Sequence, residues 1–176
     1  MAWHLPLKSW KRMVCALAAS TAALATTGDV KADDDEGCRS LDGPFSSVTV
    51  PPPACSSPVG LCTHGLLAGD FPATYDFTFS TLQSTKDPTD PTAFVYTGHS
   101  VVTTPAGAMH TDDSGVIHIP ADGSPAPFVT TASVASGTAR YAGETGVFVA
   151  TGKLNFATGL AVGSFVANLC GKHSGA

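Results

Sequence analysis

Short segments of alternating apolar and polar residues, separated by Gly, Pro and Asp, fill the chain from residue 62 onward. The clearest alternation covers residues 146–156 and follows the glycine-rich stretch GTARYAGETG, residues 137–146. The sequence has no comparable helical period after its first 25 residues. Short strands bounded by turn residues are typical of one small all-β barrel or sandwich. This pattern constrains the architecture far more than it constrains the activity.

Eight strand candidates follow from the positions of the turn residues. They cover residues 62–69, 74–83, 93–104, 107–112, 116–119, 128–137, 146–156 and 160–170. Asp113-Ser114-Gly115 is interpreted as a tight hairpin turn, with Asp112 and Asp113 as turn residues. Eight strands close a barrel whose interior is just wide enough for side chains or one small ligand. The sequence therefore predicts an all-β, eight-stranded, antiparallel up-and-down barrel of the calycin type.

The first 32 residues are expected to be a secretory signal peptide. Basic residues precede a short apolar stretch, and small residues precede possible cleavage sites after Ala25 or Ala32. An uncleaved N-terminal anchor is the alternative, but the apolar stretch is too short for an integral membrane span. The rest of the chain is divided into an acidic, proline-rich segment, residues 33–60, and a barrel domain, residues 61–171. We interpret the first of these as an irregular strap over the barrel wall.

The net charge and the number of cysteines indicate where the protein resides and which partners it does not bind. The chain of 176 residues has a formal net charge of −5 at pH 7. An acidic chain is a poor partner for nucleic acid and for anionic membrane surfaces. The cysteines beyond the predicted signal are even in number, as is usual for disulfides in an oxidising compartment. We therefore expect a secreted or periplasmic protein that binds no nucleic acid.

These cysteines can pair in more than one way. We favour Cys62 with Cys170, because they open the first and close the last predicted strand, and these strands are neighbours in a closed barrel. Cys38 would then pair with Cys55 and tie down the N-terminal segment. Cys55 with Cys62, a short local loop, is the alternative. Zinc is disfavoured because the sequence has no C-x-x-C spacing.

Alternation assigns most of the aromatic side chains to the barrel interior. The residues expected to line a ligand-binding interior are Tyr75, Phe77, Phe79, Phe94, Tyr96, Phe148, Phe156 and Phe165. Tyr75 and Tyr96 also carry hydroxyl groups, which could orient a ligand oxygen or transfer a proton. They are the catalytic candidates, and ordinary core tyrosines are the alternative interpretation.

The remaining polar and apolar patterns favour simpler roles. Val147, Val149 and Val166 point outward and could form the contact of a homo-oligomer or lie under the N-terminal segment. The scattered histidines, among them His99 and His110, are expected at the surface rather than in a metal site. No motif in the sequence indicates a cofactor.

Three stretches carry a resemblance to a known family. They are SPVGLCTHGLLAGDFPATYDFTF, residues 57–79, YTGHSVV, residues 96–102, and SGTARYAGETG, residues 136–146, where Ala139 replaces an expected glycine. Together they resemble the allene oxide cyclase-like barrel superfamily, which also holds the plant dirigent proteins, and are most similar to its bacterial secreted members. The resemblance implies an eight-stranded barrel with an apolar cavity. Activities in such barrels include cyclisation of an unsaturated epoxide and stereochemical control of phenoxy-radical coupling.

Three functions remain open at this point. Binding of a small apolar molecule without chemistry is favoured. A cofactor-independent cyclase or isomerase, acting on an unsaturated apolar substrate through the shape of its cavity, is the second. A structural or interaction module is the third. The resemblance transfers no catalytic residue to this chain.

Overall fold

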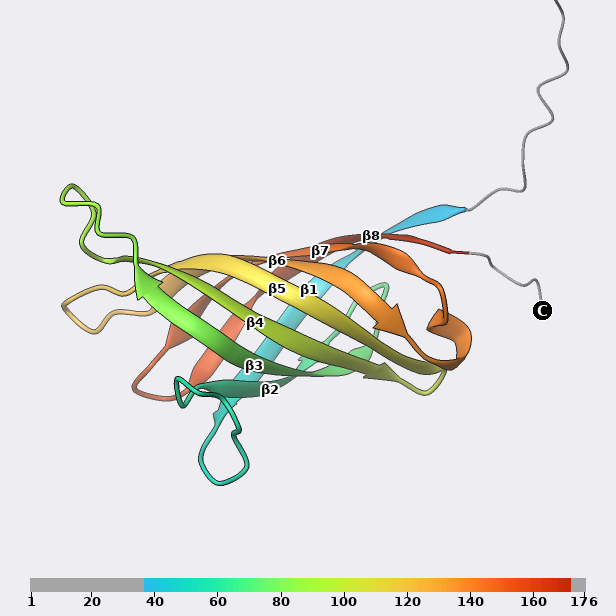
Figure 1. Cartoon of the computed structure of the whole chain (residues 1–176), viewed down its shortest axis with the longest axis horizontal. Coiled ribbons are helices and arrows are strands. Elements are labelled where there is room, and N and C mark those ends of the chain that lie inside the picture. Colours follow the sequence, from blue (N-terminus) through green and yellow to red (C-terminus); the bar gives the residue numbers. More distant parts are fainter. Residues whose placement is uncertain (1–36, 172–176) are drawn as a thin grey trace, which may run out of the picture. The chain divides into compact units, whose positions relative to one another are not determined.

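The computed structural model describes residues 37–171, which form a closed antiparallel β-barrel (Figure 1). Its strands are β1 (Cys38–Val50), β2 (Cys62–Leu67), β3 (Ala73–Ser84), β4 (Ala93–Thr104), β5 (Gly107–His118), β6 (Ala126–Gly137), β7 (Thr145–Asn155) and β8 (Leu160–Cys170), with a 3-10 turn, η1 (Ala139–Tyr141), before β7. Each strand pairs with the next, and β8 closes the barrel on β1. The predicted eight-stranded up-and-down barrel is confirmed. The expected signal peptide, residues 1–32, lies outside the described residues.

Between residues 37 and 171, no helix has the length and apolar character needed to cross a membrane.

The first strand, β1, is the main departure from the sequence prediction. Residues 38–50 were expected to form an irregular strap, but they pair with β8 from Cys38↔Cys170 to Val48↔Leu160. The barrel therefore begins at Cys38 rather than at residue 61. The proline-rich stretch that follows, residues 51–58, is a connection between β1 and β2, where prolines, which donate no ladder hydrogen bond, are tolerated.

A proline inside β1 explains why the strand was missed. Pro44 interrupts the run of ordinary strand residues and donates no ladder hydrogen bond. Its carbonyl accepts a hydrogen bond from the Ala68 N–H at 3.0 Å, just beyond the β1–β2 ladder, which starts at Phe45. The nitrogen and the carbonyl of a strand residue point to the same side. The missing N–H of Pro44 thus falls where that ladder has ended, a position that tolerates proline.

The predicted hairpin turn at Asp113-Ser114-Gly115 is also wrong. These residues lie inside β5, which pairs with β4 along its whole length. Gly115 faces the interior, where a β-carbon would lie 2.5 Å from the ring and the hydroxyl oxygen of Tyr96. The glycine therefore serves the close approach of an aromatic ring rather than a turn. Two predicted strands, residues 107–112 and 116–119, are a single strand, β5. The predicted number of eight strands is still right because β1 is an additional strand.

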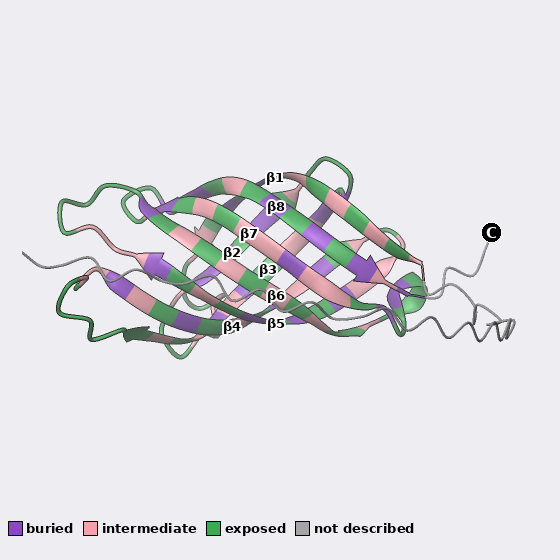
Figure 2. Ribbon diagram, turned by 90° about the horizontal axis from the view of Figure 1, so that it is seen from above, coloured by how far each residue is buried: buried purple, intermediate pink, exposed green. Residues whose placement is uncertain are grey.

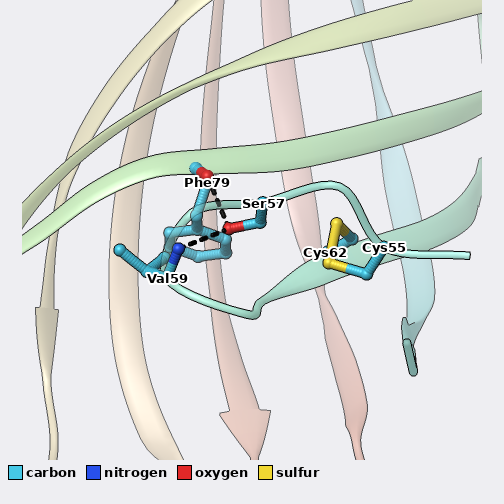
Figure 3. The surroundings of a disulfide bond; sticks show 5 residues. All are labelled: Cys55, Ser57, Val59, Cys62 and Phe79. Atoms are coloured by element: carbon cyan, nitrogen blue, oxygen red, sulfur yellow. Dashed lines mark hydrogen bonds between the residues drawn. A yellow bond between two sulfur atoms is a disulfide. The ribbon is translucent and has the colours of Figure 1, made fainter. Parts of the chain in front are cut away.

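Both favoured disulfide pairings are wrong. The bonds are Cys38–Cys170 and Cys55–Cys62, and only the second was considered, as the alternative. Because β1 lies between β8 and β2, Cys62 is not beside the last strand, whereas Cys38 stands opposite Cys170 in the ladder. Figure 3 shows Cys55–Cys62 closing the β1–β2 connection, where Ser57 Oγ donates a hydrogen bond to the Phe79 carbonyl at 2.6 Å. Such bonds fit an extracellular or periplasmic protein.

Buried and exposed residues alternate along the strands, as the stripes of Figure 2 show. The buried side chains form two hydrophobic clusters. The cluster toward η1 contains Phe71, Val102, Met109, Tyr141, Phe148, Phe165 and Leu169. The cluster toward the β3–β4 connection contains Phe77, Phe79, Tyr96, Ile117, Ala126 and Leu154. The interior is therefore packed from two directions, which leaves the middle of the barrel as the place for a cavity.

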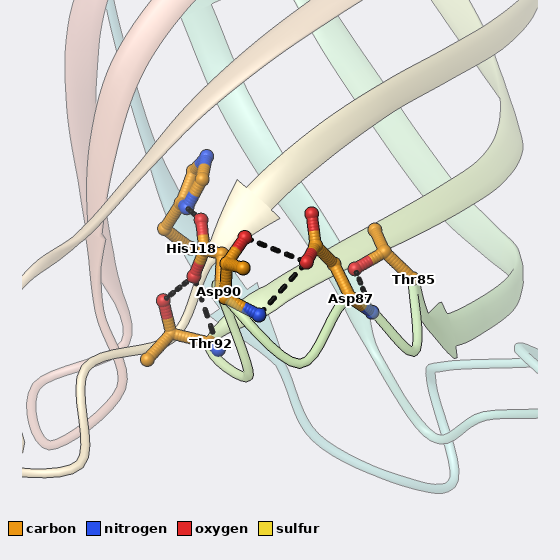
Figure 4. Close-up of polar contacts among 6 residues, drawn as sticks. Thr85, Asp87, Asp90, Thr92 and His118 are labelled. Atoms are coloured by element: carbon orange, nitrogen blue, oxygen red, sulfur yellow. Dashed lines mark hydrogen bonds and ion pairs between the residues drawn. The ribbon is translucent and has the colours of Figure 1, made fainter. Parts of the chain in front are cut away.

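The connection between β3 and β4 is held by aspartate side chains (Figure 4). Asp90 Oδ1 accepts a hydrogen bond from Thr92 Oγ1 at 2.7 Å, and Asp90 Oδ2 lies 3.0 Å from His118 Nδ1 at the end of β5. Asp87 Oδ1 accepts the Thr89 N–H at 2.8 Å in the same manner. The hydrogen bond from Thr92 lowers the pKa of Asp90. These contacts fix the loop to the rim of the barrel.

Several apolar side chains are exposed or partly exposed on the outer face of β7 and β8. Val166 is 56% exposed, and Val147 and Val149 are partly exposed, as their positions predicted. Val162 and Leu160 add to the same region of β8. That this face joins two copies of the chain stays a prediction.

Candidate functional site

A cavity of about 110 Å³ lies inside the barrel and reaches members of both hydrophobic clusters. Its aromatic lining consists of Phe45, Tyr75, Phe77, Phe79, Tyr96, Phe128, Phe148 and Phe165. Its smaller apolar lining consists of Leu67, Val102, Ile117, Ala132, Ala150, Leu154 and Ala161. An apolar cavity of about 150 Å³ admits benzene, so this one has room for a molecule of similar or slightly smaller size.

Most of the aromatic residues predicted from the sequence meet at this cavity. The lining includes Tyr75, Phe77, Phe79, Tyr96, Phe148 and Phe165. Phe94 packs against the cluster toward the β3–β4 connection and does not line the cavity. Whether the lining residues bind a ligand stays a prediction.

The placement of Phe156 in the interior is wrong. Its side chain is 47% exposed. The strand β7 ends at Asn155, whose side-chain oxygen accepts the Ala157 N–H at 2.9 Å and starts the turn toward β8. The alternation that points residues 148 and 154 inward therefore stops one residue before Phe156.

Five polar side chains lie on the part of the cavity wall contributed by β4, β5 and β6, and Ser47, Thr63 and Tyr75 add others from β1, β2 and β3. The five are Tyr96, Ser100, Thr111, Asp113 and Thr130. Because strands β4–β5 and β5–β6 are direct neighbours, these residues form one continuous patch, which we call the polar wall. Phe148, Ala150, Leu154, Ala161 and Phe165 of β7 and β8 line the cavity without a polar side chain, and we call them the apolar wall.

Asp113 is the most unusual member of the polar wall. Asp113 is only 5% exposed, although aspartate residues are rarely buried. Oδ1 accepts a hydrogen bond from Thr111 Oγ1 at 2.6 Å, and Oδ2 accepts one from Ser100 Oγ. Burial raises the pKa of Asp113, and the two hydroxyl donors offset part of that effect. The carboxyl group therefore holds its proton to a higher pH than an exposed aspartate does.

The two predicted catalytic tyrosines have different surroundings. The Tyr96 hydroxyl lies 2.5 Å from Thr130 Oγ1 and donates to the Val129 carbonyl at 3.4 Å. Burial raises the pKa of Tyr96 to about 12, so near neutral pH this hydroxyl is a donor and not a base. Burial also raises the pKa of Tyr75, partly offset by a hydrogen bond with the Ser47 side chain. Both hydroxyls can therefore orient a ligand, but neither is activated.

Sequence reasoning missed Asp113 because it was assigned to a turn. The signal that could have found it is the period of β5. Met109, Thr111 and Ile117 occupy alternate positions and are all buried, and Asp113 falls in phase with them. Continuing this alternation through Gly115 would have placed the carboxyl group inside the barrel.

The outer face of the barrel carries imidazole and carboxylate side chains that meet in pairs rather than in larger groups. His64 Nδ1 lies 2.7 Å from Asp76 Oδ1, and both side chains are exposed. His99 stands opposite Asp112 in the β4–β5 ladder. In the part of the chain that the structure describes, no group of three or more His, Cys, Asp or Glu side chains is placed to hold a metal ion.

Comparisons with known proteins add no family to this picture. Protein-family models, curated proteins and solved structures all give no match to the chain. The function of the protein is therefore inferred from the cavity and from the residues that line it.

Proposed function

We propose that this protein binds a small, largely apolar molecule in the interior of its barrel. The observation that carries the proposal is the cavity of about 110 Å³ between the polar and apolar walls. Concave sites with mostly apolar walls and a few convergent polar groups are typical ligand sites. A barrel that served only as a structural module would gain stability by filling this space, because an empty cavity forfeits packing contacts.

A cavity-filling variant tests the proposal directly. Ala150 lines the cavity on the apolar wall, so Ala150→Leu should occupy part of the space. Titration with benzene and cyclopentanol, followed by NMR, should show binding to the unmodified protein and at least a tenfold loss in the variant, about 1.4 kcal/mol. Ala157→Leu, in the exposed β7–β8 turn, is the matched control and should bind normally. Equal binding by all three proteins would place the ligand elsewhere.

The endogenous ligand can be sought in parallel. Native mass spectrometry of the oxidised protein, compared with a denatured extract, should reveal a co-purifying small molecule. A small molecule that is released on denaturation from the unmodified protein but absent from Ala150→Leu would support an interior site.

A second candidate function is a cofactor-independent cyclase or isomerase acting on an unsaturated apolar substrate. Asp113 favours it, because a buried carboxyl with a raised pKa holds a proton to higher pH and could donate it to a substrate in the cavity. The hydroxyl of Tyr96 would then polarise a substrate oxygen. In assays with apolar epoxides and polyenes, Asp113→Asn and Tyr96→Phe should each slow turnover by about a hundredfold. An unchanged rate in both variants would remove the enzyme candidate.

We also propose that the protein is exported and belongs to the allene oxide cyclase-like barrel superfamily. The disulfides and the N-terminal pattern support export, and the closed barrel with its cavity supports the family. The intact mass of the protein from its native host would test export, because cleavage after Ala25 or Ala32 gives two different masses. A mass equal to the full chain would contradict it.

A further inference from the structure

The cavity contains a buried acidic group whose hydrogen-bond partners are uncharged. Both oxygens of Asp113 accept hydrogen bonds from hydroxyl groups, those of Ser100 and Thr111. Among the described residues that line the cavity, none is Lys, Arg or His. An ionised carboxylate in an apolar interior is costly unless a cation pairs with it. The barrel thus provides a negative group for which its own cavity wall provides no counter-charge.

The ladder neighbours of Asp113 add no charge of their own. Gly98 of β4 and Ala132 of β6 stand opposite Asp113 in the two ladders, so both flanking positions are small. The ring of Phe77 lies across Gly98, 2.4 Å from where a β-carbon would stand. The carboxyl group therefore faces the cavity with an aromatic ring on one side and a methyl group on the other.

The chemistry of the lining favours a cation over a neutral polar group. A carboxylate has about four acceptor positions, and the two hydroxyl donors use only two of those of Asp113. The remaining positions are available to accept hydrogen bonds from a ligand. The faces of aromatic rings carry partial negative charge and attract organic cations, most strongly where water is excluded. Carboxylate and rings together form a site that is negative on several sides.

We propose that the ligand is a small organic cation, an ammonium group on a compact hydrocarbon, whose charge pairs with Asp113. Its hydrocarbon part packs against the apolar wall, including Phe148 and Phe165. This inference rests on the proposed function, because it names the ligand class of the same cavity. The volume of the cavity limits the cation to at most about six non-hydrogen atoms, because a larger cavity of about 150 Å³ holds benzene, which has six.

The groups around Asp113 set the direction of the pH dependence. On β4 and β5, His99 and Asp112 lie on the outer face; His99 lowers the pKa of Asp113 and Asp112 raises it, both less than burial does. On the inner face of β4, Tyr96 stays protonated. The polar side chain that β6 contributes on this side is Thr130, which is uncharged. A cation should therefore bind more tightly as the pH rises through the elevated pKa of Asp113, whereas a ligand that needs the protonated carboxyl should bind more weakly.

Three probes of matched size separate these possibilities. They are cyclopentylammonium, cyclopentanol and cyclopentanone, titrated into the full, disulfide-bonded protein from pH 4 to pH 8. We expect cyclopentylammonium to bind at least about tenfold more tightly than cyclopentanol at pH 8, as a desolvated cation–π and charge contact predicts. That preference should shrink toward pH 4.

Two neighbouring aspartates supply the variant and its control. Asp113→Asn should abolish the preference for cyclopentylammonium and leave the affinity for cyclopentanol within about threefold, since the amide keeps the shape of the carboxyl. Asp112→Asn changes the exposed neighbour and should leave the preference intact. Equal loss in both variants would overturn the assignment to Asp113.

The unmodified protein gives a second, independent measurement. The carboxyl ¹³C shift of Asp113, followed by NMR against pH, should show a lower pKa when cyclopentylammonium is bound. An unchanged pKa at saturation would overturn the inference even if Asp113→Asn failed to fold. If cyclopentanol or cyclopentanone binds as tightly as the ammonium, the cation inference fails and the binding function stands. If none of the three binds, both fail.

Discussion

The polar and the apolar walls of the cavity face the same space but carry side chains of different chemistry. The polar wall places a buried carboxyl group and several hydroxyls on β4, β5 and β6, whereas the apolar wall presents two phenyl rings and small aliphatic groups from β7 and β8. Apolar contact provides affinity in proportion to the area that it removes from water. Convergent polar groups provide orientation and selectivity. Under the proposed function, the apolar wall would supply affinity for the ligand and the polar wall would supply selectivity.

The largest effect should come from truncating the apolar wall. Phe165 is 3% exposed, and its ring centroid lies 6.3 Å from that of Phe148. Phe165→Ala should lower the free energy of unfolding by about 3–5 kcal/mol, because it removes buried area and enlarges the cavity. Urea unfolding measures the loss. Val166→Ala, on the exposed face next to it, should cost little, and a similar cost for both would contradict the description of this wall.

A smaller effect should come from adding one methyl group within the polar wall, between Tyr96 and Thr130. A β-carbon at Gly115 would lie 2.3 Å from the Val129 carbonyl oxygen and 2.5 Å from the Tyr96 ring. Gly115→Ala should therefore destabilise the barrel by about 1–3 kcal/mol through overpacking. Thermal unfolding, with Ser114→Ala as the exposed control, tests this. A neutral Gly115→Ala would mean that both the Val129 carbonyl and the ring of Tyr96 are free to move aside.

Removing one hydroxyl from the polar wall should cost still less. Tyr96→Phe keeps the ring and loses the hydrogen bonds to Thr130 and to the Val129 carbonyl. We expect a loss of about 1 kcal/mol in the free energy of unfolding. Thr130→Val and the double variant complete a mutant cycle. Strict additivity would show that the two hydroxyls do not interact.

The contribution of Asp113 to the free energy of unfolding should change with pH. The folded-state pKa of Asp113 is raised by burial, so the native state holds this proton at pH values where the unfolded state has released it. The contribution of Asp113 to stability is therefore greatest below the ordinary carboxyl pKa of about 4 and falls as the pH rises to the raised value. Comparing denaturation of the unmodified protein and Asp113→Asn across pH 3–8 isolates this contribution. A constant difference would contradict the buried position.

The sequence predicts the barrel well because alternation is a local property that survives in each strand. It predicts Tyr75, Phe77, Phe79, Tyr96, Phe148 and Phe165 at the cavity for the same reason. Prediction from the sequence fails where a residue type that is typical of turns is placed inside a strand by its tertiary contacts.

Three particular positions show this failure. Pro44 and Gly115 look like turn residues, but one sits where a ladder ends and the other under an aromatic ring. Asp113 looks like a turn residue as well, yet its hydroxyl partners make burial possible. None of these partners is close enough in sequence for a local pattern to reveal it, apart from Thr111. The disulfides follow the same logic, because their pairing depended on finding β1.

The bond between Cys38 and Cys170 has a mechanical consequence. It joins residues 132 positions apart that face each other across the β1–β8 seam, beside the ion pair of Arg39 with Glu144. A tensile load applied at these two residues would pass through a single covalent bond and bypass the hydrogen-bonded ladders. The barrel should therefore resist stretching between these points until a reductant reaches the sulfur atoms, so that its response to force is set by redox chemistry.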